Sequence, residues 1–321
     1  MNALTRDLVK LVETADQSQK TREELSVSDR KFREKLHLMP PVGWLNDPNG
    51  LCQFQGIYHA FFQYSPFNAE GGVKMWGHYT SKDMIKWEYQ GTALYPDQPF
   101  DCHGVYSGSA FIEDGKMYLY YTGNVKLEDG EYDYIRTGRE GNTVLVITED
   151  GKTFGKKKEL MRNSDYPDDL TCHVRDPKVW KENGTYYMVQ GARTNKDVGQ
   201  VLVFESEDKV NWKFRNRVES EKPFGYMWEC PDYFKIGDKK LLSTSVQGLE
   251  GAVGILNSNK AKVVDRFSDI SSETEELAAS SQDILGKVDQ QSVEMENIHT
   301  AIESLHNVVT KLNEIMDQFT V

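Results

Sequence analysis

Two aspartates, each followed directly by a proline, are the first candidates for chemistry in this 321-residue chain. Asp47 lies in Trp-Leu-Asn-Asp-Pro-Asn-Gly at 44–50, and Asp176 lies in Arg-Asp-Pro at 175–177. Proline restricts the backbone, and Asn and Gly favour a chain reversal, so each carboxylate is expected to be held in place. The plainer interpretations are a turn cap for Asp47 and a surface ion pair between Arg175 and Asp176.

A third acidic residue, Glu229, lies between Trp228 and Cys230 and just before Pro231. These neighbours predict that its side chain is partly removed from water, which favours the protonated form. The alternative is a glutamate at a strand edge that faces solvent. One ionised carboxylate and one protonated carboxylic acid are the minimum that hydrolysis of a glycosidic bond requires. The three acids together therefore indicate a glycoside hydrolase.

Three further clusters combine aromatic rings with amide or hydroxyl groups. They are Phe-Gln-Tyr at 62–64, Trp-Gly-His at 76–78 and Tyr-Ser-Gly-Ser at 106–109. Each cluster alone is more often part of a core or a turn. Flat aromatic faces and hydrogen-bonding side chains are also what a sugar ring needs, so the clusters favour a carbohydrate substrate.

The elements that position these residues are predicted to be β-strands. Short runs rich in Tyr, Phe, Val and Trp alternate with polar turns throughout 31–254. A glycine followed by a Tyr-rich strand returns near Gly56, Gly115 and Gly184. A period of about 60 to 70 residues with several strands per unit is typical of β-propeller blades, and a β-sandwich is the alternative. Residues 1–30 predict a polar helix that packs outside this body.

The composition changes sharply near residue 255. Beyond that point only Phe267, Phe319 and Gly286 represent the aromatic residues and glycine, and Trp, Tyr, Pro and Cys are absent. Seventeen positions then follow one another at steps of three and four over 263–319, and fourteen of them are apolar. This period predicts a left-handed coiled coil, so 255–321 is expected to be one long α-helix. Because a helix cannot bury so narrow a stripe alone, we expect a homo-oligomer through 263–319.

The bulk properties exclude several classes of partner. A net charge of −12 argues against nucleic acid and anionic membrane surfaces. No apolar run approaches the ~18 residues that would span a bilayer. The N-terminus is charged and lacks the apolar core of a signal peptide, which favours a cytoplasmic location. The cysteines show no metal-ligand spacing, so no metal is expected.

Six motifs carry a family resemblance: WLNDPNG, FFQYSP, WGHYTS, YSGS, RDP and ECP. They occur in the order seen in glycoside hydrolase family 32, the invertases and sucrose-6-phosphate hydrolases, which 31–254 resembles. The resemblance implies a five-bladed β-propeller followed by a β-sandwich, and a retaining β-fructofuranosidase without a cofactor. It implies that Asp47 is the nucleophile, Glu229 the general acid/base and Asp176 the residue that holds fructose hydroxyls and stabilises the transition state. The other substrate-binding residues that it implies are Asn46, Gln63, Trp76, Ser107 and Arg175.

The matching motifs end near Gly254, within what would be the fourth blade. The resemblance therefore implies about three and a half blades and one uncovered wall of the central funnel. Misplacing a catalytic group by ~1 Å can lower a rate by roughly 100-fold, so truncation can abolish activity. The choice between sucrose, sucrose 6-phosphate and fructan stays open.

The helical segment has its own resemblance. Ser-Ser-Glu-Thr-Glu-Glu-Leu-Ala-Ala-Ser at 271–280 resembles the methylation region of bacterial chemoreceptor signalling domains, with Glu275 and Glu276 as candidate methyl acceptors. Two surface glutamates on a coiled coil explain the pattern equally well. Besides a hydrolase of sucrose or its 6-phosphate, two hypotheses follow. One is an oligomerising, chemoreceptor-like coiled coil with an inactive sugar-binding remnant, and the other is a non-functional chimera.

Overall fold

The computed structural model describes residues 8–17, 34, 37–222 and 224–248, together with 290–291, 295–296 and 299–300. The chain divides into two compact units, Met1–Ala252 and Val253–Val321. In the second unit the six described residues are helical and exposed. Most of the predicted coiled-coil seam, together with Glu275 and Glu276, lies outside the described residues, so the coiled coil stays a prediction.

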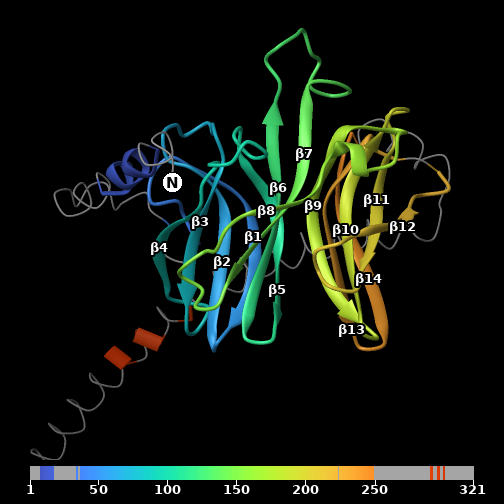
Figure 1. Cartoon of the computed structure of the whole chain (residues 1–321). Coiled ribbons are helices and arrows are strands. Elements are labelled where there is room, and N and C mark those ends of the chain that lie inside the picture. Colours follow the sequence, from blue (N-terminus) through green and yellow to red (C-terminus); the bar gives the residue numbers. More distant parts are fainter. Residues whose placement is uncertain are drawn as a thin grey trace, which may run out of the picture. The chain divides into compact units, whose positions relative to one another are not determined.

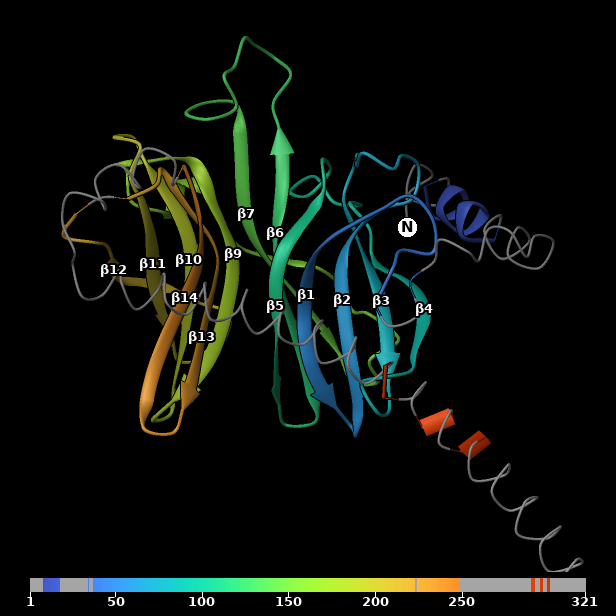
Figure 2. The same ribbon diagram turned by 180° about the vertical axis from the view of Figure 1, so that it is seen from behind.

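The first unit is built from antiparallel sheets that follow one another along the chain (Figures 1 and 2). In each sheet, strands that are consecutive in sequence pair with one another. The first sheet contains β1 (Trp44–Phe54), β2 (Ile57–Ser65), β3 (Met75–Ser81) and β4 (Trp87–Leu94). The second contains β5 (Val105–Glu113), β6 (Lys116–Lys126), β7 (Arg139–Thr148) and β8 (Lys158–Met161). The third contains β9 (Leu170–Glu182), β10 (Thr185–Thr194), β11 (Gly199–Ser206) and β12 (Lys213–Val218).

The last strands of the described part form a two-stranded hairpin of β13 (Met227–Ile236) and β14 (Lys239–Gln247). A short 3₁₀ turn, Asn163–Asp165, precedes β9. The prediction that 31–254 is mainly β is confirmed. Residues 8–17 form a helix whose Val12 is fully buried against the aromatic side of the first sheet.

The first hairpin of each four-stranded sheet closes with the same turn. Two residues connect β1 to β2, β5 to β6 and β9 to β10, and each pair has positive φ at both positions. These pairs are Gln55-Gly56, Asp114-Gly115 and Asn183-Gly184. Two positive φ values define a type I′ turn, which suits the right-handed twist of the flanking strands. The glycines whose spacing suggested a repeat therefore mark equivalent turns in successive sheets.

A second repeated turn joins the third strand of each sheet to the fourth. A Ser or Thr, an Asp two residues later and an aromatic residue six later recur at 81–87, 148–154 and 206–212. At 81–87 the Ser81 hydroxyl accepts the Met84 N–H at 2.9 Å, and Asp83 accepts the Ile85 and Lys86 N–H groups at 2.9 and 2.7 Å. The other two copies repeat these bonds. The repeat is visible in the sequence, although it was not among the predicted features.

Aromatic clusters between neighbouring sheets form the core. Trp76 and Tyr121 pack between the first and second sheets, and Tyr120 and Phe204 pack between the second and third. Trp228 joins the β13–β14 hairpin to the third sheet. The first strands of successive sheets also touch, β1 with β5, β5 with β9 and β9 with β13. The strands that carry the predicted site residues therefore lie side by side.

Among the described helical residues, no helix is long and apolar enough to cross a bilayer.

Candidate active site

A break in the strand register lies at or next to each of the main site residues. The ladders of β1 and β5 skip Asp47 and Ser107 respectively. The ladder of β9 skips Asp176, and that of β13 breaks directly after Glu229 and skips Cys230. Such bulges bend a strand and redirect a side chain away from the regular alternation. The same irregularity on four neighbouring strands therefore places these side chains in one region.

Proline explains three of these breaks. Asp47, Asp176 and Cys230 are each followed by a proline, which has no N–H to donate to a ladder. At β9 and β13 the skipped residue also has positive φ, 64° for Asp176 and 46° for Cys230. Residues with a Cβ rarely adopt this conformation, and in folded proteins it gathers at functional sites.

Asp47 is held by a chain of hydrogen bonds from neighbouring strands. The Ser107 hydroxyl donates to Asp47 Oδ2 at 2.7 Å, and Gln63 Nε2 donates to Ser107 Oγ at 2.6 Å. Asn46 Nδ2 lies 3.1 Å from the other oxygen, Asp47 Oδ1. Of the predicted site residues, Asn46, Gln63 and Ser107 are thus gathered around Asp47.

Trp76 is buried in the core next to the residues that surround Asp47. Its side chain is fully buried between Phe61 and Tyr121, and its indole N–H donates to the Tyr106 carbonyl at 3.0 Å. In the ladder Trp76 lies opposite Gln63. Trp76 therefore supports the backbone next to Ser107 and the strand that carries Gln63, with no ring face open to solvent.

Arg175 joins Glu229 to the rest of the site. Its Nε and Nη2 donate to the same oxygen, Glu229 Oε1, at 3.0 and 2.6 Å, and Gln247 Nε2 donates to the other, Oε2. The third guanidinium nitrogen, Nη1, lies 2.5 Å from His173 Nδ1. Burial, followed by the charge of Arg175, lowers the pKa of His173 to about 3, so the imidazole is neutral and accepts this hydrogen bond.

Glu229 is partly removed from water, as predicted, with its side chain 24% exposed, but Trp228 is not the residue that covers it. The Trp228 ring packs with Phe224 and its N–H donates to the Phe224 carbonyl, while Glu229 points toward Arg175. Consecutive side chains of a strand point to opposite faces, so Trp228 does not cover the carboxylate. A guanidinium and an amide, rather than an indole, therefore surround Glu229.

Asp176 is buried within electrostatic reach of the two other acids. It is 6% exposed, accepts the Cys230 N–H at 2.9 Å and lies 3.9 Å from Arg175 Nε. Burial raises the pKa of Asp176 to about 6; Arg175 and the Cys230 N–H oppose this shift, and the charges of Glu229 and Asp47 add to it. The field of both other carboxylates acts on Asp176, so the structure brings the three predicted acids together.

Four contributors were not predicted. His173 and Gln247 orient the Arg175–Glu229 pair. Thr122 accepts the Asp176 N–H at 2.9 Å, and Asn49 accepts the Gly108 N–H at 2.9 Å. Asn49 lies within the motif that singled out Asp47, which was a usable signal. Gln247 reaches Glu229 through the pairing of β13 and β14, and Thr122 reaches Asp176 from a different sheet, so no local pattern marks these two. His173 lies two residues before Arg175, outside the recognised motif.

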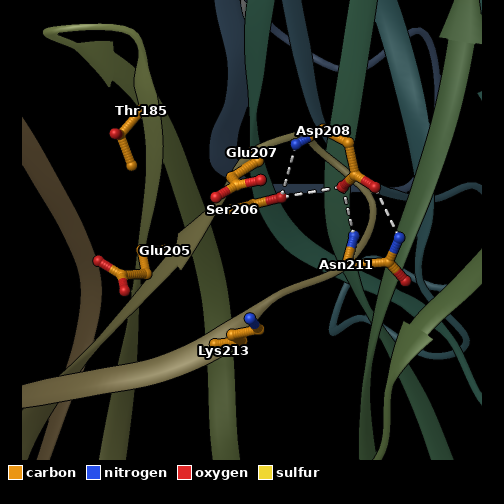
Figure 3. Close-up of a pocket in the computed structure, with 7 residues that line it drawn as sticks. All are labelled: Thr185, Glu205, Ser206, Glu207, Asp208, Asn211 and Lys213. Atoms are coloured by element: carbon orange, nitrogen blue, oxygen red, sulfur yellow. Dashed lines mark hydrogen bonds between the residues drawn. The ribbon is translucent and has the colours of Figure 1, made fainter.

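A separate hollow of about 250 Å³ lies beside β11 and β12 (Figure 3). Its lining includes the repeated turn, in which Asp208 accepts hydrogen bonds from Ser206 and Asn211. None of the predicted site residues lines it. The hollow is thus not part of the candidate active site.

A carboxylate fixed by a hydroxyl, close to a glutamate fixed by a guanidinium, places the molecule among the mainly β glycoside hydrolases. Comparison with known proteins identifies the family of glycoside hydrolases. The family model for the glycosyl hydrolases family 32 N-terminal domain matches residues 37–298, and the chain belongs to this family. The match continues beyond residue 254, where the recognised motifs end.

Relatives of known activity are similar over the same region. The chain is 44% identical over 223 residues to the sucrose-6-phosphate hydrolase of Bacillus subtilis, covering 68% of this chain and 44% of the relative. It is 44% identical over 215 residues to the raffinose invertase of Escherichia coli, covering 67% of this chain and 44% of the relative. The chain thus spans less than half the length of these curated relatives.

Solved structures agree with the fold. A sucrose-6-phosphate hydrolase from Lactobacillus gasseri matches with a TM-score of 0.66 and 31% identity, covering 75% of this chain and 47% of the other. A family 32 β-fructofuranosidase from Bombyx mori matches with a TM-score of 0.63 and 33% identity, covering 75% and 49%.

Proposed function

We propose that this chain is a retaining β-fructofuranosidase that hydrolyses sucrose or sucrose 6-phosphate. The observation that carries the proposal is the convergence of Asp47, Asp176 and Glu229 on one region of four neighbouring strands. The relatives named above as sucrose-6-phosphate hydrolase and raffinose invertase support the substrate class.

In this proposal Asp47 attacks the anomeric carbon of the fructosyl unit. The Ser107 hydroxyl and the Asn46 amide fix both of its oxygens, so the nucleophile is oriented before substrate arrives. The attack gives a covalent fructosyl ester and releases the glucosyl group. Water then cleaves the ester from the same face, so two displacements retain the configuration of the fructose.

Glu229 is the proposed general acid and base. It protonates the departing glucosyl oxygen in the first step and takes a proton from water in the second. Arg175 and Gln247 each hold one of its oxygens and set the direction of proton transfer. Asp176, in its ionised form, accepts hydrogen bonds from fructose hydroxyls and stabilises the positive charge that develops on the ring.

The test is turnover by the purified chain. We expect release of fructose from sucrose or sucrose 6-phosphate, and a fall of at least about 1,000-fold in kcat for Asp47→Asn and for Glu229→Gln. Asp114→Asn is the matched control, because Asp114 lies exposed in the β5–β6 turn, whose positive φ asparagine tolerates. Equal rates for the Asp47→Asn and Asp114→Asn proteins would contradict the proposal.

The second unit is proposed to be an oligomerising helix. Its apolar seam over 263–319 supports this. Sedimentation of residues 256–321 alone tests the idea, and a monomer without helical signal would refute it. A protein that oligomerises and binds sucrose without turnover would support the receptor-like alternative.

A further inference from the structure

Two cations at one end of the second sheet face each other without a carboxylate between them. Lys126, the last residue of β6, lies directly opposite Arg139, the first residue of β7. Among the described residues, neither has an ion-pair partner. Like charges directly opposite on neighbouring strands are destabilising. In this protein the nearby acids are engaged elsewhere, since Glu128 lies 3.7 Å from His103 and Glu140 accepts from Asn142.

A third cation, Lys74, connects this pair to the candidate active site. Among the described residues its ammonium donates only to the Gly72 carbonyl. It lies 5.1 Å from the Trp44 ring centre and 5.8 Å from that of Tyr106, the residue before Ser107. Burial lowers the pKa of Lys74, the charges of Lys126 and Arg139 lower it further, and that of Asp47 raises it. Lys74 is thus within electrostatic reach of both the cationic pair and the candidate nucleophile.

Arg139 also has an unmet hydrogen bond. Its Nε is buried and has no acceptor among the described residues. A buried charged donor without an acceptor is destabilising. Folded proteins satisfy most such groups, so the Arg139 guanidinium has hydrogen-bonding capacity that the described residues do not use. A ligand with several anionic oxygens would serve all three cations at once.

We propose that Lys74, Lys126 and Arg139 bind the phosphate of a phosphorylated disaccharide whose fructosyl unit lies at Asp47. A phosphate monoester carries about −1.5 to −2 charges and three acceptor oxygens, which suits one guanidinium fork and two ammonium groups. The Trp44 and Tyr106 rings next to Lys74 and the Tyr134 ring 5.4 Å from Lys126 Nζ place aromatic surface beside the cations, as sugar-binding sites often have. The proposal rests on the proposed function and assigns sucrose 6-phosphate, rather than sucrose, as the preferred substrate.

The test compares the double variant K126Q/R139Q with the wild-type chain. Lys74 is left intact because it is close to Asp47. The matched control is K116Q/K158Q, which removes the same charge from β6 and β8 of the same sheet, outside the cluster. We expect the double variant to raise KM for sucrose 6-phosphate by about 10- to 100-fold and to change kcat/KM for sucrose by less than about 3-fold. The control is expected to leave both substrates unaffected.

A binding measurement separates this proposal from the proposed function. Calorimetry on the Asp47→Asn chain uses sucrose 6-phosphate, sucrose and inorganic phosphate as probes. Tighter binding of the phosphorylated sugar, lost when K126Q/R139Q is added, supports the phosphate site even if the wild-type chain hydrolyses nothing. Equal binding of the two sugars, or equal losses for both in the double variant, overturns the phosphate site, even if turnover is observed. Inorganic phosphate that binds as tightly as the sugar phosphate also overturns it, because the cluster is then a general anion site.

Discussion

Asp176 makes a specific contribution to the dependence of stability on pH. Its pKa rises from 3.8 in a free chain to about 6 in the folded protein, mainly because it is buried. The folded state therefore binds this proton more tightly than the unfolded state. The stability that the group contributes is complete below pH 4 and is lost as the pH rises through about 6.

The size of the effect follows from that shift. A shift of about 2 units at 1.36 kcal/mol per unit is about 3 kcal/mol. Asp176→Asn removes the titration, so the free energy of unfolding of the wild type relative to this variant should fall by up to about 3 kcal/mol between pH 4 and pH 7. The amide can also change the stability of the variant by an amount that does not depend on pH, and this leaves the change of the difference between pH 4 and pH 7 unaltered.

Urea unfolding followed by tryptophan fluorescence is a suitable assay. All six tryptophans precede residue 229, so the signal reports on the first unit alone. Asp133→Asn is a control for which the change of stability with pH has the opposite sign. Three backbone N–H groups lower the pKa of Asp133 to about 2. Here the wild type should gain stability over the variant as the pH rises from 2 to 4. A difference between wild type and Asp176→Asn that stays flat from pH 4 to pH 7 would refute the reasoning.

Three further predictions test the packing of the site. Lys157→Met should lower the free energy of unfolding by about 3–5 kcal/mol in urea, because Lys157 contacts the fully buried Asp101 at 2.6 Å; a loss below about 1 kcal/mol would contradict this. Gly191→Ala should give insoluble or strongly destabilised protein, because its Cβ would lie 1.9 Å from the Trp228 carbonyl; a wild-type melting temperature would exclude the close approach. Arg175→Lys should lower kcat/KM by about 10-fold or more while the fold is retained, because an ammonium cannot replace the fork on Glu229; unchanged kinetics would show that the fork is dispensable.

Local features of the sequence were enough to predict the strands and their first turns. Alternating aromatic and β-branched residues mark strands, and Gly56, Gly115 and Gly184 mark reversals, because each feature depends on residues close together in the chain. Asp47 and Asp176 stood out for the same reason, since each precedes a proline that forces it out of the ladder.

Features that depend on pairing between strands could not be predicted in this way. Gln247 reaches Glu229 only because β14 pairs with β13, and Lys126 meets Arg139 only through the register of β6 and β7. The partial burial of Glu229 was attributed to the wrong residue, because Trp228, its neighbour in sequence, was taken as its neighbour in space. Trp228 lies on the other face of the strand, and Arg175, a residue 54 positions away, becomes the partner of Glu229.

The register breaks have a consequence for how such a site can change. Because the ladders of β1, β5 and β9 step around Asp47, Ser107 and Asp176, a substitution there removes no ladder pairing between strands. The pairing between strands therefore does not depend on which side chains stand at these positions, whereas the buried Asp176 carboxyl still changes the stability of the folded protein with pH. New specificities can arise by exchanging these few side chains on an unaltered set of sheets, and an ancestral framework can persist after its chemistry has been lost.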